Sequence, residues 1–217
     1  MKYKSLLKAT VAVFGITGAL QAFAVPIVGL YNTGVGTAVA GGADANYSLV
    51  KTSGAGAGLL TAYQGTGING NWLANDATSQ WLTPASNGNQ TFDASSNGVY
   101  EYSLSFDLTG MNAATATFTG RWATDNAGKI FLNGTQLNNN SNGFNSWSSF
   151  SSAGGSFISG INTLTFEVTN FAQTRGNPTG LHVEFTGSNV EVPEPSALAV
   201  LSIGLIGLGI SRRRKSW

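Results

Sequence analysis

Strict alternation of apolar and polar residues over residues 99–108 limits the folds open to this chain of 217 residues. The segment VYEYSLSFDL places five apolar residues on one face: Tyr100, Tyr102, Leu104, Phe106 and Leu108. Because successive side chains of a strand point to opposite faces, this pattern predicts a half-buried strand of about ten residues. Helical periodicity is hard to find between residues 25 and 190, so we expect an all-β body there.

Two later segments, NTLTFEVTN and GLHVEFTG, show the same alternation. Their apolar faces predict that Phe166, Val183 and Phe185 are buried together with Phe106. The opposite face of the second segment carries His182 and Glu184. We expect this polar face to be in contact with solvent.

Short strands separated by turn signals make up the rest of the body. ATATFTGRWA and KIFLNG are two further expected strands, joined by a turn over residues 124–128. PIVGLY, NYSLVKT and SQWLT are weaker candidates, whereas we expect residues 133–155 to be loops and residues 187–195 to be a linker. This spacing predicts a β-sandwich of the jelly-roll kind, whose connections lie at its two ends.

The first 24 residues have the layout of a secretory signal peptide. A basic start precedes the apolar residues 9–20, and Ala22-Phe23-Ala24 supplies small residues at Ala22 and Ala24 for cleavage. A buried core helix is the alternative, but the order of charge, apolar run and Ala-x-Ala favours export through the Sec machinery and cleavage by signal peptidase. We therefore divide the chain into a signal peptide (1–24), a body (25–190) and a tail (191–217).

The body is mildly acidic. It has four Lys and Arg residues against eight Asp and Glu residues, a net charge of −4. Nucleic acids bind clustered cations that neutralise phosphates, so we expect no nucleic-acid partner. The chain has no Cys, so burial and hydrogen bonds must stabilise the exported body without disulfides.

The tail combines an extended entry, an apolar segment and a cationic end. Pro193 and Pro195 keep the chain extended, which suits the grip of a processing enzyme. As a helix, residues 196–210 would span about 22 Å at 1.5 Å per residue. This is less than the about 30 Å of a bilayer's hydrocarbon core. The four cations at residues 212–215 would stay cytoplasmic.

Val192-Pro193-Glu194-Pro195, the short apolar segment and Arg212, Arg213 and Arg214 resemble the PEP-CTERM sorting signal of Gram-negative envelope and biofilm proteins. The resemblance implies that an exosortase recognises Pro-Glu-Pro and removes a tail that anchors the protein to the inner membrane only transiently. The protein would then reach the cell envelope, the surface or the extracellular matrix. An ordinary single-pass anchor is the alternative.

The body segments TGRWATDNAGKIFLNG, FISGINTLTFEVTN and GNPTGLHVEFTG resemble the later strands of galactose-binding-like and other sugar-binding sandwich domains. Many such domains bind carbohydrate, and others are purely structural. The resemblance makes Trp72, Trp147 and Phe144 candidate glycan-binding residues, because aromatic faces stack on sugar rings. Core packing is the alternative, and we favour it for Trp81 and Trp122. An exopolysaccharide is the partner that this interpretation implies.

Oxygen-bearing side chains in and after the turn suggest a weaker second site. Asp125, Asn126 and Asn133 offer the oxygen ligands that Ca²⁺ prefers. The alternative, which we favour, is that Asp125 and Asn126 shape a turn that closes a hairpin. We expect no other cofactor.

The sequence gives little support for catalysis. It has one His and neither a Cys nor a G-x-S-x-G elbow, so a nucleophilic triad is not expected. Glycoside cleavage by two carboxylates is the minor alternative. The strand carboxylates are Glu101, Asp107, Glu167 and Glu184, all on polar faces where solvated charges usually lie. We expect a protein that is not an enzyme.

Overall fold

The computed structural model describes residues 23–141, 143–153, 155–193 and 203–205. One compact unit runs from Phe23 to Pro193. A second unit comprises Met1–Ala22 and Glu194–Trp217, of which the structure describes the helical residues 203–205. The rest of the predicted sorting helix and most of the predicted signal peptide therefore lie outside the described residues. No helix in the described ranges is both long enough and apolar enough to cross a membrane.

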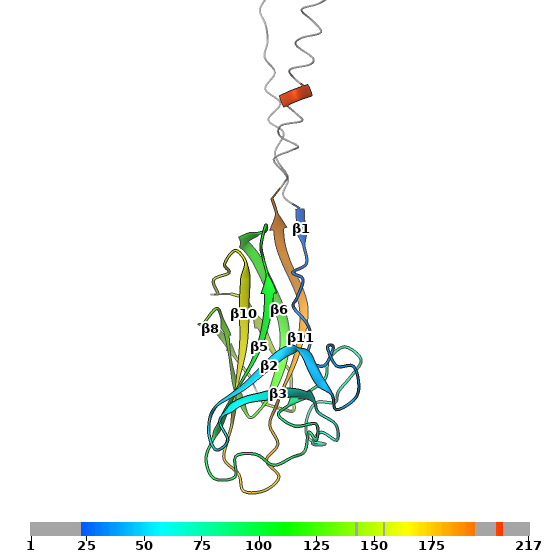
Figure 1. Ribbon diagram of the computed structural model, residues 1–217, viewed down its shortest axis with the longest axis vertical. Coiled ribbons are helices and arrows are strands. Elements are labelled where there is room, and N and C mark those ends of the chain that lie inside the picture. The colour runs from blue at the N-terminus through cyan, green and yellow to red at the C-terminus, as the bar shows by residue number, and fades with distance from the viewer. Residues whose placement is uncertain (1–22, 142, 154, 194–202, 206–217) are drawn as a thin grey trace, which may run out of the picture. The chain divides into compact units, whose positions relative to one another are not determined.

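The body is built from antiparallel strands, which confirms the predicted all-β class (Figure 1). Its eleven strands are β1 (Phe23–Val25), β2 (Ala43–Ser53), β3 (Gly58–Gln64), β4 (Leu82–Thr83), β5 (Gly98–Asp107), β6 (Asn112–Asp125), β7 (Ala127–Leu132), β8 (Thr135–Asn140), β9 (Ser148–Ser151), β10 (Ile161–Asn170) and β11 (Gly180–Val192). They pair in the order β8-β7-β10-β5-β2-β3-β4-β11-β6-β9, and β1 adds to β11.

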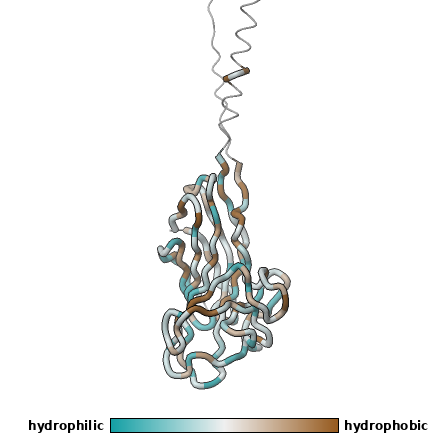
Figure 2. The backbone as a smooth tube through the Cα atoms, viewed as in Figure 1, coloured by the Kyte–Doolittle hydropathy of each residue, from teal (hydrophilic) through white to brown (hydrophobic). Residues whose placement is uncertain are grey.

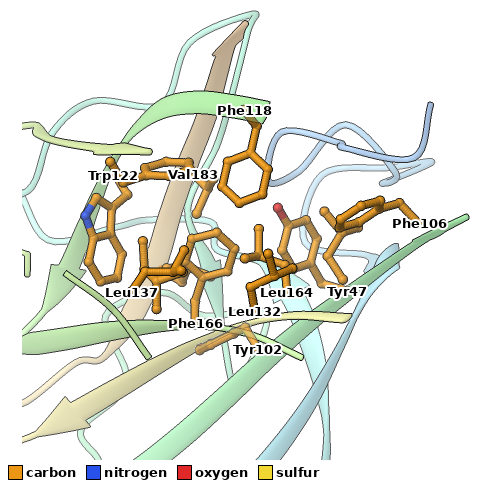
Figure 3. Close-up of a cluster of buried hydrophobic side chains, with 14 of the residues drawn as sticks. Tyr47, Tyr102, Phe106, Phe118, Trp122, Leu132, Leu137, Leu164, Phe166 and Val183 are labelled. Carbon is orange, nitrogen blue, oxygen red and sulfur yellow. The ribbon is translucent and has the colours of Figure 1, made fainter. Parts of the chain in front are cut away.

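The core lies between the β7-β10-β5-β2 part of this sheet and the β11-β6-β9 part (Figure 3). Phe166 on β10 is fully buried, and its ring centroid lies 5.8 Å from that of Trp122 on β6 and 5.9 Å from that of Phe150 on β9. Figure 2 shows hydrophobic residues recurring along the strands that enclose this core. The sheet thus folds over on itself into the predicted sandwich.

The best alternating segments form the strands that they predict. β5 alternates between buried and more exposed positions along most of its length. Phe106, Phe166 and Val183 are buried as expected. Phe185 differs, because it is partly buried and packs at the border of the core, beside an irregular register between Phe185 and Gly187. The expected core positions of Trp81 and Trp122 are confirmed.

Several boundary predictions are wrong. PIVGLY forms no strand, and only Leu82 and Thr83 of SQWLT do. Two strands, β8 and β9, lie in the stretch expected to be loops, and β11 continues to Val192 through the expected linker. Predominantly polar strands such as β8 carry too few apolar residues for alternation to be visible in the sequence.

The prediction that His182 and Glu184 face solvent is also wrong. Both point away from the main core, as the alternation requires, but His182 is 0% exposed and Glu184 is 9% exposed. The loop between β3 and β4 brings Trp72 and Trp81 over this side of β6 and β11, where they form a second cluster with Ala123. The second face of the sheet is therefore covered at this end of β6 and β11, whereas Thr117 and Thr119 further along β6 are exposed.

A side chain joins the two ends of the strand order. Asn139 on β8 donates from Nδ2 to the Ser151 carbonyl oxygen on β9 at 2.9 Å, and its Oδ1 accepts from the Ser151 amide at 3.3 Å. This carboxamide makes the pair of bonds that a neighbouring strand would make. The sheet consequently approaches a closed barrel at this seam.

The two ends of β11 define the two ends of the body. Gly180 pairs with Asp125 at one end, and Glu191 pairs with Asn112 near the other. The last residues of β11 also pair with β1, where Ala24 lies opposite Glu191. The predicted signal cleavage site therefore adjoins the start of the sorting tail, because Ala24 lies in β1.

Candidate functional site

A small polar cavity opens at the Gly180 end of the body, among the loops drawn at the bottom of Figure 1. Its volume is about 160 Å³. We call it the pole pocket, and it is lined by Asn69, Asn71, Trp72, Asp125, Asn126, Phe144, Gln173, Gly176, Asn177 and Pro178. Four residues from two separate sequence predictions thus meet in one place: Trp72, Phe144, Asp125 and Asn126.

Asp125 is the charged residue of the pole pocket. It is the last residue of β6 and is 5% exposed. Its Oδ2 accepts a hydrogen bond of 2.8 Å from Trp72 Nε1, and its Oδ1 accepts one of 2.6 Å from Asn126 Nδ2. Burial raises the pKa of the Asp125 carboxyl to about 6, against the opposing effect of the Trp72 hydrogen bond. Each oxygen keeps a second acceptor site that a ligand hydroxyl could use.

The opposite wall of the pole pocket is the loop between β10 and β11. Asn177 Nδ2 donates to the carbonyl oxygens of Phe92 and Phe171, at 2.8 and 2.9 Å. The Phe171 amide donates to Asn126 Oδ1 at 2.7 Å, which connects this loop to the turn after β6. These bonds fix the polar groups before any ligand arrives, so the site is preorganised.

Trp72 does not have the exposed face that the sequence prediction assigns to it. It is 6% exposed, and its ring packs 4.2 Å from that of Trp81. Its role in the pocket is therefore to hold the Asp125 carboxylate through Nε1. Phe144 is only partly buried and supplies aromatic surface to the pocket.

Trp147 lies apart from the pole pocket. Its ring packs 4.6 Å from that of His182, and the Arg121 guanidinium lies 4.6 Å from its centroid. The His182 ring lies in turn 5.2 Å from that of Trp81. Trp72 and Trp147 are thus the two ends of an aromatic row and do not form one binding surface.

Asn133 is also distant from Asp125. It lies in the turn after β7, where its Oδ1 accepts from the Thr163 amide at 2.9 Å and its Nδ2 donates to Asn162 Oδ1 at 2.9 Å. The six residues of β7 separate the two positions by about 20 Å at 3.3 Å per residue. Since Ca²⁺ ligands lie about 2.3–2.6 Å from the ion, Asn133 cannot share one with Asp125 and Asn126. In the described part of the chain, no group of three or more His, Cys, Asp or Glu residues could hold a metal ion.

The turn between β6 and β7 differs from the expected hairpin. β6 pairs with β11 and β9, whereas β7 pairs with β10 and β8. Asp125 and Asn126 therefore lie where the chain crosses from one layer to the other. This crossing explains how they reach the loops of both layers.

A Ser–His pair escapes sequence analysis, because Ser79 and His182 are far apart in the chain. Ser79 Oγ lies 2.9 Å from His182 Nε2, the spacing of a nucleophile and its base. The two residues are 1% and 0% exposed, and burial lowers the pKa of His182 to about 4. No substrate carbonyl can reach this Ser in the folded body. Of the other strand carboxylates, Glu101 and Glu167 are partners in the register of β5 and β10.

Comparison with known families identifies the function of the C-terminal tail. The PEP-CTERM protein-sorting motif matches residues 191–215. This chain carries a PEP-CTERM sorting signal. The matched range contains all seven residues that the sequence assigns to the signal, from Val192 to Arg214. The signal implies export, sorting at the membrane through the C-terminal tail and processing by an exosortase.

No curated protein matches the chain in sequence. Among solved structures, it is similar to β-glucosidase from Kluyveromyces marxianus in complex with glucose, at 7% identity and a TM-score of 0.35, over 74% of this chain and 20% of that one. It is also similar to a family 35 carbohydrate-binding module from an environmental isolate, at 15% identity and a TM-score of 0.30, over 68% of this chain and 98% of that one. The GH31 α-xylosidase from Xanthomonas citri gives 10% identity and a TM-score of 0.30, over 72% of this chain and 17% of that one. The chain thus spans about a fifth of the two glycosidases, and similarities of this size assign no function to it.

Proposed function

We propose that this exported PEP-CTERM protein is an envelope or matrix component whose body binds a glycan in the pole pocket. The observation that carries the proposal is the convergence of amides, one carboxylate and two aromatic side chains, Trp72 and Phe144, in a single preorganised cavity. Planar amides and carboxylates donate to and accept from neighbouring sugar hydroxyls, and an aromatic ring packs on the apolar face of a sugar.

The volume of the pole pocket limits the size of the ligand that it can hold. Cavities for drug-sized ligands measure about 300–1,000 Å³. At about 160 Å³, the pole pocket suits one sugar residue, such as a chain end or a branch of an exopolysaccharide. Hydrogen bonding rather than broad stacking dominates recognition, because Trp72 is buried.

Processing at both ends completes the proposed function. Signal peptidase cuts after Ala24 once the Sec machinery has exported the chain, and the tail then holds the protein at the inner membrane. An exosortase cuts near Pro193-Glu194-Pro195 and releases the body to the envelope, the surface or the matrix. The matched sorting motif supports this order of events.

Asn71 offers a clean test of glycan binding. Asn71 lines the pole pocket and is exposed to solvent. Asn71→Ala should therefore leave the free energy of unfolding within about 0.5 kcal/mol of that of the wild type. The matched control is Asn138→Ala, an exposed substitution on β8, which does not line the pocket. We expect wild type and control to bind one glycan on an array that includes the producer's own polysaccharide, and Asn71→Ala to bind it about two- to tenfold more weakly.

Two results would count against the proposal. Equal affinity of the Asn71→Ala and Asn138→Ala variants would place any binding outside the pole pocket. Absence of binding to every glycan, including the producer's own polysaccharide, would favour a purely structural matrix component.

A further inference from the structure

A buried ion pair lies behind the wall of the pole pocket without lining it, and the proposed function does not use it. Lys51 on β2 places its Nζ 2.6 Å from Asp93 Oδ1, in the segment between β4 and β5. The Lys51 side chain is 6% exposed and that of Asp93 is 0% exposed. A Cβ atom at Gly98 would overlap the Asp93 carboxylate, so the start of β5 is shaped to admit this group.

Every other contact of the pair is made by a neutral group. Asp93 Oδ2 accepts from the Tyr100 hydroxyl and from Asn170 Nδ2, both at 2.8 Å. Lys51 Nζ donates to the Ala55 carbonyl oxygen at 2.7 Å. Burial, with a further contribution from Asp93, raises the pKa of Tyr100, so the phenol stays a donor. The amine therefore approaches one carboxylate oxygen while two donors polarise the other.

From this arrangement we propose that Lys51 and Asp93 condense into an intramolecular isopeptide bond. Oδ1 lies one carbon–oxygen bond from the carboxyl carbon of Asp93. The distance from Lys51 Nζ to that carbon therefore exceeds the 2.6 Å to Oδ1 by at most the length of this bond. The two reacting atoms are therefore at most about 3.8 Å apart, only slightly beyond the about 3–3.5 Å of reactive conformers, and this proximity brings a large effective concentration.

The reaction balances without an external reagent. The ammonium gives one proton to Asp93 Oδ1, and the neutral amine then attacks the carboxyl carbon. The negative charge that develops on Oδ2 is stabilised by the Tyr100 and Asn170 donors, as in an oxyanion hole. The attacking nitrogen loses a second proton to Oδ1, which leaves as water when the carbon–oxygen bond breaks. No group is oxidised or reduced.

The product fits the contacts already present. The single N–H of the new amide keeps the Ala55 carbonyl as its acceptor, and the amide oxygen keeps Tyr100 and Asn170 as donors. Two buried charges are replaced by one neutral amide whose polar atoms are all satisfied. Because the site excludes water, hydrolysis of the amide is also hindered.

Tryptic digestion of the purified full chain tests the bond directly. Between residues 25 and 190 trypsin can cut after Lys51, Arg121, Lys129 and Arg175 alone. An acylated Lys51 resists trypsin, so we expect one fragment that contains both Lys51 and Asp93, ends at Arg121 and is lighter than its sequence by one water. Fragmentation should place the link between Lys51 and Asp93.

Lys51→Arg is the matched control, because it keeps the positive charge and the tryptic site but supplies no amine that can be acylated. Asp93→Ala removes the acyl group. Both variants should be cut after residue 51 and should show no loss of water. Recovery of separate wild-type peptides that end at Lys51 and begin at Thr52, at full mass, would overturn the proposal. An uncut, lighter fragment in Asp93→Ala would overturn it too.

Discussion

Replacement of Glu184 by Ala tests whether the outer face of β11 is truly covered. Glu184 Oε2 accepts a hydrogen bond of 2.8 Å from an Arg121 guanidinium nitrogen and a longer one of 3.4 Å from Ser79 Oγ. The Glu184 side chain is 12% exposed, whereas that of Arg121 is 40% exposed. The substitution removes a nearly buried carboxylate and leaves a half-exposed cation.

These exposures set the expected magnitude. Solvent-exposed ion pairs contribute about 0–1 kcal/mol, and breaking a fully buried pair costs about 3–5 kcal/mol. Arg121 can regain water after the change, so the loss should lie between these limits. We expect Glu184→Ala to lower the free energy of unfolding by about 2 kcal/mol, the range of a hydrogen bond to a charged group.

Urea titration of the full chain measures this loss, and Glu167→Ala is the control. Glu167 lies 3.6 Å from Lys129, a longer contact whose side chains are 22% and 53% exposed, so its removal should cost no more than about 0.5 kcal/mol. A double-mutant cycle with Arg121→Met should show a coupling of about 1 kcal/mol to Glu184. If Glu184→Ala is as mild as Glu167→Ala, the carboxylate is solvated and the covered face is refuted.

Four further outcomes follow from the contacts described above. Phe166→Ala, in the centre of the core, should cost about 3–5 kcal/mol in the same titrations, and a loss below about 1 kcal/mol would contradict its burial. The raised pKa of Asp125 means that the unfolded state loses its proton first, so stability should fall by about 2–3 kcal/mol as pH rises from about 4 to 6, a trend that Asp125→Asn should abolish. The lowered pKa of His182 has the opposite effect, so stability should fall by about 3 kcal/mol as pH falls from about 6.5 to 4, and His182→Gln should remove this loss. A wild type without this loss would show that the His182 ring is solvated. Asn139→Ala should cost about 1–2 kcal/mol and speed amide exchange at Ser151, whereas unchanged exchange would show that the seam is not held by this side chain.

Local patterns in the sequence predict the strands that have a buried face and a more exposed face. β5 and β10 alternate because they lie side by side with one face on the core, and Phe166 could be assigned to that core from its neighbours alone. Alternation also places His182 and Val183 on opposite faces correctly. It does not say that a separate loop carrying Trp72 and Trp81 covers the second face, because that contact joins distant parts of the chain.

The same limit applies to the pole pocket. Phe144 and Trp72 stand out in the sequence as aromatic residues in polar loops, and Asp125 stands out as a turn residue. Their convergence depends on the crossing between β6 and β7, whereas the sequence suggests a simple hairpin. The hydrogen bond from Trp72 to Asp125 joins positions 53 residues apart and has no local signature.

The sorting tail could be recognised from sequence because its recognition depends on order and composition rather than on tertiary contacts. Pro193, Glu194 and Pro195 precede the apolar segment and the cations within 25 matched residues, 191–215. The polar strands β8 and β9 are the opposite case. Leu137 and Phe150 are their buried apolar residues, and one such residue in each strand gives no readable period.

β11 runs from the pole-pocket end of the body to Val192, the first residue of the Val-Pro-Glu-Pro motif, about 40 Å at 3.3 Å per residue. A body held by its C-terminal end and bound to a polymer at the other end would therefore bear tension along this strand. Tension parallel to a strand loads its ladder to β6 in shear, so many hydrogen bonds must yield together, whereas peeling breaks them one at a time. The fold thus places one of its two longest ladders, that of β11 with β6, along the line between the proposed tether and the proposed ligand, which would suit a protein that must resist pulling while its tail is held.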